Sequence, residues 1–345
     1  MGDSIKPAED RKPPGLVYVS DWTPGITRRR RGRGFSYHDP AGRPVTTAER
    51  ARIAALAVPP AYEDVWICPS PRGHLQVTGL DQAGRKQYRY HPEWSAWRAR
   101  DKFGQLAAFG AALARFRARV QRDLARDAGD LEFGLAAVAM LLDRAHPRLG
   151  SAVQAADSRT YGATTLLNRH LRLEDGTARL RYRAKGGRIV QHTLRGRRLH
   201  RIFEAIDDLP GRNLFTYVAP DGEVRPIGSH HVNAYIAEAT GLNFVTAKTF
   251  RTWAGSVAAF AVARKERGRL TVRAMAEAAA ARLHNTPAIS RSAYIHPAVL
   301  DLATLERDER IRVLRAIRPS GPARLRADER RLLGLLRRVD PDLGE

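Results

Sequence analysis

Four residues between positions 148 and 294 of this chain are of the types that could transfer a phosphoryl group without a metal ion. Tyr294 offers a phenol oxygen as a nucleophile. Arg148 and Arg251 offer fixed positive charges that could stabilise the non-bridging oxygens of a phosphate. Lys185 can release a proton, which an arginine cannot do, so it suits the protonation of a departing sugar oxygen. Together they would supply a nucleophile, charge stabilisation and an acid.

Each of these residues lies in a recognisable local setting. Arg148, in "AHPRLGS", follows a predicted helix, where an arginine taken alone would be ordinary. Lys185, in "YRAKGGRI", occupies the tip of a predicted hairpin and is one of only seven lysines. Arg251, in "TAKTFRTWAGS", lies near the start of a helix that Thr246 could cap, and Tyr294 follows the helix that carries "AARLHNTP". The question is whether the fold brings these four segments together.

Other chemistries find little support in the chain. It has no GxxxxGK[ST] loop for ATP, and the glycines of "AKGGR" belong to a hairpin turn. No acidic pair is typical of a two-metal nuclease, and the adjacent His230 and His231 would point about 100° apart on a helix. Cys68 is the single cysteine, and no Cys/His cluster has zinc spacing. We therefore expect neither a metal nor a cofactor.

The charge of the chain points to a polyanionic partner. Lys and Arg number 59 against 36 Asp and Glu, for a formal net charge of +23, and such an excess favours nucleic acid. A GC-rich genome would explain arginine in place of lysine, but not the net excess. There is no run of eighteen apolar residues and no apolar leader after the first residues, so we expect a cytoplasmic protein without a membrane span.

The pattern of elements predicts an α+β protein with two domains after a disordered tail at residues 1–15. Residues 16–92 are predicted to form a small β-rich domain with one helix at 46–56, and the basic run Arg28–Arg33 to form a loop or arm, either solvated or phosphate-binding. Residues 93–345 are predicted to be mainly helical, with a β-hairpin or three-stranded sheet inserted at 164–194. Apolar residues at three- and four-residue spacing predict a first helix over 103–124, and "LEFGLAAVAMLLDRAHPRLG" predicts a second that Pro147 and Gly150 stop. Further helices are predicted at 198–209, 229–240, 247–264, 271–283, 297–315 and 327–339.

The order of the chemical residues resembles that of the type IB DNA topoisomerases, specifically the small poxvirus-like form found in bacteria. The segment "LLDRAHPRLG" resembles the family's first arginine box, and "YGATTLLNRHL" resembles the motif that follows it. "AKGG" is similar to the lysine hairpin, "TFRTW" to the second arginine box, and "NTPAISRSAYIH" to the tyrosine box. Near the N-terminus, "GRKQYRY" resembles a DNA-contacting motif. These six matches occur in the family's order.

The resemblance implies a monomeric clamp on double-stranded DNA, acting at the nucleoid. It implies that Tyr294 attacks a backbone phosphate and forms a 3′-phosphotyrosyl link, with Lys185 as the general acid. The non-bridging oxygens would be held by Arg148, Arg251 and Asn285. Positive and negative supercoils would relax without ATP or metal before the strand is resealed. The DNA contacts implied are Arg85, Lys86, Gln87, Tyr88, Tyr90 and Tyr161.

Two positions depart from the family's pattern. Asn285 stands where the family often has histidine before T-P, and His284 precedes it. The unbroken register of "NTPAIS" favours Asn285 for that role, with His284 as the alternative. Thr249 stands where the family commonly has aspartate, which removes a salt bridge that would orient Arg251.

Two other functions remain as alternatives. A site-specific tyrosine recombinase would use the same nucleophile, but it would show an H-x-x-R box where this chain has Lys248 to Arg251, and the β-rich N-terminal domain differs from the helical one usual in that group. A non-catalytic DNA-binding protein would need the charge but not the order of arginine, lysine, arginine and tyrosine. Supercoil relaxation that depends on Tyr294 would distinguish the enzyme from the binding protein.

Overall fold

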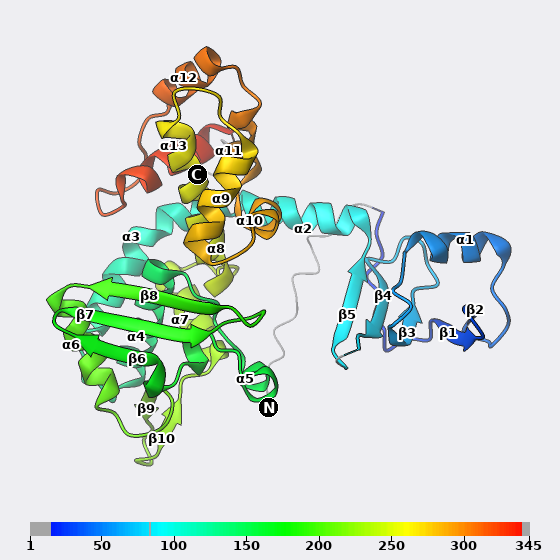
Figure 1. Cartoon of the computed structure of the whole chain (residues 1–345), viewed down its shortest axis with the longest axis horizontal. Coiled ribbons are helices and arrows are strands. Elements are labelled where there is room, and N and C mark those ends of the chain that lie inside the picture. The colour runs from blue at the N-terminus through cyan, green and yellow to red at the C-terminus, as the bar shows by residue number, and fades with distance from the viewer. Residues whose placement is uncertain (1–14, 83, 340–345) are drawn as a thin grey trace. The chain divides into compact units, whose positions relative to one another are not determined.

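The computed structural model describes residues 15–82 and 84–339 and divides into two compact units, Met1–Lys102 and Phe103–Glu345 (Figure 1). The tail predicted to be disordered, residues 1–15, lies outside the described residues except for Gly15. Helix α2 (Pro92–Gly104) begins at the predicted domain boundary, and the first unit ends within this helix, at Lys102. Helices and strands both contribute, and the predicted α+β class is confirmed.

The first unit is an antiparallel five-stranded sheet with strand order β2-β1-β3-β4-β5, accompanied by one helix. Its elements are β1 (Ile26–Arg31), β2 (Gly34–His38), α1 (Thr47–Ala55), β3 (Glu63–Ile67), β4 (Leu75–Leu80) and β5 (Lys86–Tyr90). Helix α1 starts where predicted, because the hydroxyl of Thr46 accepts from the backbone N–H of Glu49, whose carboxylate in turn accepts from the N–H of Thr46. Its buried Ile53 packs with aliphatic side chains of the sheet to form a small core of its own.

The prediction of a loop or arm at Arg28–Arg33 was wrong. Residues Ile26–Arg31 form strand β1, which pairs with β2 through a turn at Gly32 and Arg33. The run of arginines hides the alternation that normally marks a strand. The Arg28 side chain turns back to donate to the carbonyls of Pro59 and Tyr62, so at least one of these arginines is structural.

The second unit is mainly helical, and its helices bury most of the apolar residues of the chain. They are α3 (Leu106–Asp123), α4 (Leu131–Ala145), α5 (Ala152–Ser158), α6 (Arg197–Asp207), α7 (Ser229–Thr240), α8 (Ala247–Lys265), α9 (Val272–Leu283), α10 (Pro287–Tyr294), α11 (Pro297–Leu300), α12 (Arg307–Ala316) and α13 (Ala327–Val339). Helix α4 is buried along almost its whole length, which explains its lack of a polar face.

One predicted helix of the second unit was wrong. The segment 297–315 is not continuous: α11 passes into a 3₁₀ turn, Asp301–Ala303, and α12 begins only at Arg307. The hydroxyl of Thr304 donates to the carbonyl of Asp301 at 2.7 Å. A side chain that hydrogen-bonds to nearby backbone competes with the helix, and the break lies at this point.

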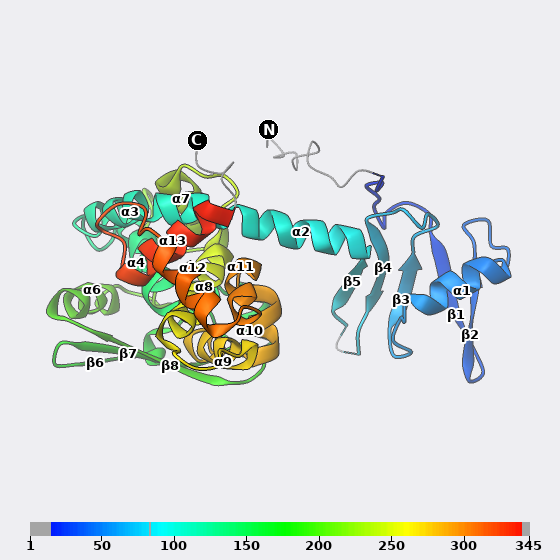
Figure 2. The ribbon, with the colours of Figure 1, turned by 90° about the horizontal axis from the view of Figure 1, so that it is seen from above.

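A three-stranded antiparallel sheet with order β6-β7-β8 is inserted between the helices. Its strands are β6 (Leu171–Glu174), β7 (Thr177–Arg183) and β8 (Ile189–Arg195). The sheet starts later than residue 164, because two 3₁₀ turns, Ala163–Thr165 and Asn168–His170, precede it. Buried and exposed residues alternate strictly along β7 and β8. Helix α6 packs on the buried face (Figure 2), and a smaller hairpin pairs β9 (Thr216–Val218) with β10 (Val224–Pro226).

The opposite face of this sheet is exposed and basic. The arginines exposed on its strands are Arg172, Arg179, Arg181, Arg183 and Arg195. Arg172 lies directly opposite Arg179 in the antiparallel register. Like charges in that position destabilise a sheet, and only Arg179 has a carboxylate partner, Glu174 at 3.0 Å, in the described part of the chain. The face therefore suits contact with a polyanion.

Candidate active site

The phenol of Tyr294 is held at the end of a short helix of its own. Tyr294 follows the predicted helix, α9, but that helix ends at His284 with a left-handed backbone, φ 51°, and a second helix, α10, begins after Thr286. The Thr286 hydroxyl caps α10 by accepting from the N–H of Ile289, and Pro287 follows as a first helical residue that needs no N–H partner. Tyr294, the last residue of α10, packs against Ala254 and Leu283 and is 9% exposed.

The seam between α8 and α10 fixes the backbone of Tyr294. The hydroxyl of Ser256 donates to the Tyr294 carbonyl at 3.4 Å and accepts from the N–H of His296 at 2.9 Å. A Cβ added to Gly255 would lie 2.4 Å from that same carbonyl oxygen and 3.0 Å from the Cβ of Tyr294. Because real Cβ atoms essentially never come closer than 3.0 Å, only glycine allows the two helices this approach.

Arg251 lies beside the phenol. Its guanidinium carbon is 5.1 Å from the centroid of the Tyr294 ring, and the side chain is only 4% exposed. One terminal nitrogen donates to the carbonyl of His146, and the other donates to the carbonyl of Leu283 at 3.0 Å. Burial lowers the pKa of Arg251, and the neighbouring Tyr294 opposes that shift. Carbonyl groups at the ends of α4 and α9 therefore hold the guanidinium. They orient Arg251 in place of the salt bridge that Thr249 cannot form.

Arg148 reaches the same place from the loop after α4. His146 ends α4 with a left-handed backbone, φ 53°, and Pro147 prevents the helix from continuing. The Nη2 of Arg148 donates to the Oδ1 of Asn285 at 2.7 Å, across 137 residues of sequence. Asn285 is 9% exposed and its N–H donates to the carbonyl of Ala280 at 3.1 Å. The structure thus joins Arg148 to Asn285 and Arg251 to Tyr294.

The loop of Arg148 is packed against the segment "YGA". The N–H of Ala163 donates to the carbonyl of Arg148, and the N–H of Tyr161 donates to the carbonyl of Arg183, both at 2.8 Å. A Cβ on Gly162 would lie 2.5 Å from the carbonyl oxygen of Arg148. The segment therefore ties the arginine loop to the end of strand β7, and a glycine is required at the point of closest approach.

Lys185 lies on the exposed turn between β7 and β8. Gly186 and Gly187 allow this turn, because their φ angles of 83° and 77° lie in the left-handed region. Ala184, the residue before Lys185, lines a small cavity of about 10 Å³, which is about the minimum room for one water. The same cavity is lined by Arg148, Tyr161, Arg251 and His284, so the base of the hairpin borders the arginine cluster.

Two histidines near this cluster, His146 and His192, were not assigned from the sequence. His146 is 4% exposed, its Nδ1 lies 3.0 Å from the Leu142 carbonyl, and burial lowers its pKa to about 3. His192 lies 3.2 Å through its Nε2 from the hydroxyl of Tyr182, and burial lowers its pKa to about 4. The ring of His284 packs edge-on against His192 at 5.0 Å, whereas Asn285 bonds to Arg148. No motif spacing marks His146 and His192, because their position depends on where a helix ends and a strand pairs.

Two buried donors in the cluster have no protein partner in the part of the chain that the structure describes. They are the Nε of Arg251 and the Nδ2 of Asn285. Buried polar groups are nearly always paired, so an unpaired donor calls for an explanation. Both belong to residues that the sequence had marked for contact with the same phosphate. An anion with several acceptor oxygens would satisfy both.

The predicted DNA-contacting residues of the first unit lie on or beside β5. Tyr88 and Tyr90 are 50% and 45% exposed, and their rings stack with centroids 6.3 Å apart, so neither is a core tyrosine. Lys86 lies on the same side, 5.9 Å from the Tyr88 ring, and pairs with Asp21 at 2.6 Å. Gln87 occupies the alternate strand position, where its side chain donates to Asp81 at 2.9 Å.

The remaining predicted contacts are placed as follows. Arg85 pairs with Asp81 at 2.7 Å in the first unit. Tyr161, in the second unit, accepts a hydrogen bond from Arg169 at 3.1 Å. No group of three or more His, Cys, Asp or Glu within residues 15–82 and 84–339 could hold a metal ion. No helix in those ranges is long and apolar enough to cross a membrane.

Comparison with known proteins identifies the family. Residues 34–81 match the bacterial DNA topoisomerase IB N-terminal domain, and residues 92–294 match the catalytic core of eukaryotic DNA topoisomerase I. A DNA topoisomerase 1B of Acanthamoeba polyphaga mimivirus is 27% identical over 293 residues, covering 81% of this chain and 87% of the viral protein. The second match alone covers more than half of the chain and ends at Tyr294. The chain therefore belongs to the type IB DNA topoisomerases, a family of isomerases.

Proposed function

We propose that this topoisomerase relaxes positive and negative supercoils of double-stranded DNA by a swivel around a transient covalent link to Tyr294. The observation that carries the proposal is the pair of unpaired donors, Arg251 Nε and Asn285 Nδ2, in a buried cluster that also contains the phenol and Arg148. The cluster thus has two hydrogen-bond donors that the protein leaves unpaired and a nucleophile beside them. Cleavage of a phosphodiester requires both, because charge builds up on the phosphate oxygens in the transition state.

In the proposed first step, the phenol of Tyr294 releases its proton to solvent, and its oxygen attacks a backbone phosphorus and forms a 3′-phosphotyrosyl bond. The bond from phosphorus to the 5′-oxygen breaks, and that oxygen takes a proton. Arg148, Arg251 and Asn285 hold the non-bridging oxygens while their charge increases. Burial favours this role, because a fixed charge acts more strongly in a site that excludes water.

Lys185 is the proposed source of that proton. Its turn is exposed and is closed by hydrogen bonds of the hairpin itself, such as the one from the N–H of Gly187 to the carbonyl of Ala184, and the base of the hairpin borders the arginine cluster. The tip of the hairpin can thus reach a groove of the duplex while its base stays anchored. A lysine can donate and recover a proton in each cycle, which an arginine in the same place could not.

In the proposed second half of the reaction, the free 5′-hydroxyl end rotates and torsional strain is released. The hydroxyl then attacks the phosphotyrosine and the phenol leaves. One phosphodiester is exchanged for another, so the free energy of the bond is retained and the cycle consumes no ATP. No step as proposed needs a metal ion.

We also propose that both units contact the same duplex as a monomeric clamp. The support lies in the aromatic and basic side of β5 in the first unit and the arginine face of β6, β7 and β8 in the second. Binding through arginines and phosphates should weaken steeply as salt is added.

The deciding experiment is plasmid relaxation in EDTA without ATP, on substrates of both supercoil signs. We expect the wild type to relax both signs and Tyr294→Phe to relax neither while still binding DNA. Tyr235→Phe is the matched control, because Tyr235 is also buried but donates to Asp123 in another part of the unit. Failure of the wild type to relax plasmid that it binds would reject the proposal and favour a recombinase or a binding protein.

Lys185 needs a separate test. We expect Lys185→Arg and Lys185→Ala to lower single-turnover cleavage by about 10²- to 10⁴-fold, the contribution typical of a general acid. Arg188→Ala, which removes a charge from the other side of the same hairpin, serves as the control. Equal rates for Lys185→Arg and wild type would exclude proton donation by this residue.

A further inference from the structure

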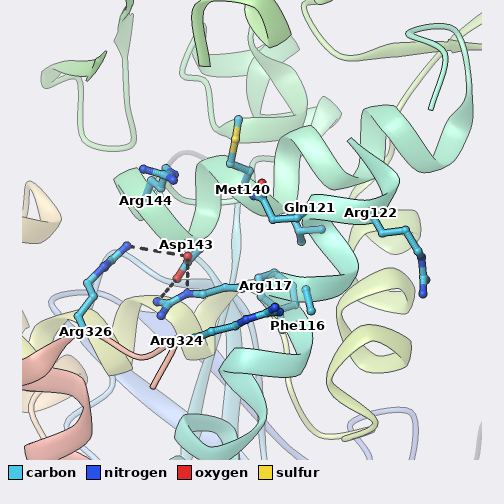
Figure 3. A pocket seen from close by; sticks show the side chains of 11 residues that line it. Phe116, Arg117, Gln121, Arg122, Met140, Asp143, Arg144, Arg324 and Arg326 are labelled. Atoms are coloured by element: carbon cyan, nitrogen blue, oxygen red, sulfur yellow. Dashed lines mark hydrogen bonds and ion pairs between the residues drawn. The ribbon is translucent and has the colours of Figure 1, made fainter. Parts of the chain in front are cut away.

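We propose that an arginine-lined cavity in the second unit binds a small polyphosphate anion. The cavity has a volume of about 600 Å³ and is formed by α3, α4 and the segment that precedes α13. Its arginines are Arg117, Arg122, Arg144, Arg324 and Arg326, and its single acidic lining residue is Asp143. Figure 3 shows these side chains around the cavity. None of them belongs to the cluster around Tyr294.

The floor of the cavity is held by a guanidinium that lies between two carboxylates. Arg117 donates two hydrogen bonds to Asp143, at 2.9 and 2.8 Å, and two to Glu329, at 2.8 and 2.7 Å. The side chains of Arg117 and Glu329 are 16% and 3% exposed. Burial acts to raise the pKa of Asp143, but Arg117 holds that pKa below its ordinary value. A fully bonded guanidinium such as Arg117 therefore shapes the cavity and has little capacity left for a ligand.

The rim carries positive charge that the protein does not balance. Arg144 and Arg324 are exposed, and neither has an acidic partner among the described residues. Arg326 lies 3.9 Å from Asp143 and 3.6 Å from Glu329, so its charge balances the second of the two carboxylates that Arg117 bridges, and Arg144 and Arg324 carry the excess. Each guanidinium has five N–H donors in a planar fork that matches phosphate oxygens. Arginines from α4 and from the chain before α13 thus converge on one cavity with donors unused.

The shape of the site favours a compact anion over a nucleic-acid strand. A volume of this size is typical of cavities that enclose small ligands. One sign of charge within a concave wall focuses the potential and raises the local concentration of counter-charged molecules. A chain of two or three phosphates would offer enough oxygens to engage Arg144, Arg324 and Arg326 together. Inorganic polyphosphate and the phosphate chain of a nucleotide share this chemistry.

Isothermal titration of the full chain with inorganic tripolyphosphate tests the proposal. We expect saturable binding to the wild type, and binding weakened on the order of tenfold for each arginine removed in Arg144→Gln/Arg324→Gln. Arg312→Gln/Arg315→Gln is the control, because it removes two exposed charges from α12, outside the cavity. Equal binding by both variants, or none by the wild type, would overturn the proposal.

Two further titrations identify the source of the phosphate and separate the site from DNA. ATP binding more tightly than tripolyphosphate would identify a nucleotide as the ligand, and weaker binding of ATP would identify the inorganic chain. Duplex affinity should be the same in the cavity variant and the control variant. If the cavity variant lost duplex affinity as well, the arginines would be DNA contacts and the proposal would fall. None of these outcomes depends on whether Tyr294 is the nucleophile.

Discussion

Gly255→Ala tests whether the position of the Tyr294 backbone controls the reaction. The new Cβ would lie 2.4 Å from the carbonyl oxygen of Tyr294, about 1 Å short of the ordinary contact distance of 3.4 Å. The oxygen cannot retreat alone, because the Ser256 hydroxyl bonds to it and to the N–H of His296. Helix α10, with the phenol at its end, must therefore move relative to Arg251 on α8.

The size of the effect follows from this displacement. Overpacking a core by one methyl group typically costs about 1–3 kcal/mol of stability. A misplacement of about 1 Å at a reacting group can lower the rate on the order of 10²-fold. We thus expect Gly255→Ala to fold with a lowered midpoint of unfolding and to cleave DNA about 100 times more slowly than the wild type, on the same principle.

The assay is single-turnover cleavage of a short duplex that traps the covalent adduct. Gly134→Ala is the matched control, because its Cβ would lie 2.4 Å from the side chain of Ile227, on α4 and away from the phenol. Gly134→Ala should lose less stability, because the end of the Ile227 side chain can move aside whereas a backbone carbonyl cannot, and only Gly255→Ala should lose the cleavage rate. Wild-type cleavage by Gly255→Ala, or an equal loss in Gly134→Ala, would refute the reasoning.

Three more predictions follow from buried charges and exposed aromatics. Glu329→Gln should lower the free energy of unfolding by roughly 1.5–3 kcal/mol in urea, because Arg117 would lose its charged hydrogen bonds to Glu329 while it keeps those to Asp143. A loss below about 1 kcal/mol, on the same scale, would contradict this. The free energy of unfolding should fall as the pH drops from about 6.5 toward 4, because buried histidines with lowered pKa values stay neutral in the folded state and become protonated in the unfolded state. Unchanged urea midpoints at pH 7.5 and 5, on either side of about 6.5, would exclude this. These histidines are His146, with a pKa of about 3, and His192 and His296, with pKa values of about 4. Tyr88→Ala with Tyr90→Ala should weaken duplex binding severalfold at an unchanged melting temperature, because both exposed phenols can donate to the DNA backbone. Equal affinity by fluorescence anisotropy would remove β5 from the DNA contact.

Local sequence was sufficient for the elements whose signals are local. The three- and four-residue spacing of apolar side chains predicted α3, and α1 lies within the helix predicted at 46–56. The glycines after Lys185 predicted a hairpin turn, because few other residues adopt their φ angles. The same reasoning failed at Arg28, where a run of like charges concealed a strand, and at Thr304, where a side-chain hydrogen bond ends a helix.

The sequence by itself determined which residue types were present and in what order, and the order was enough to predict the family. Only the tertiary structure decided that Arg148 bonds to Asn285 across 137 residues and that Arg251 lies over the Tyr294 ring. Such contacts depend on where helix α4 ends, how α9 turns into α10 and how closely Gly255 lets α8 approach. These contacts result from packing and hydrogen bonding between segments that are distant in the sequence. No local pattern of residues predicts them.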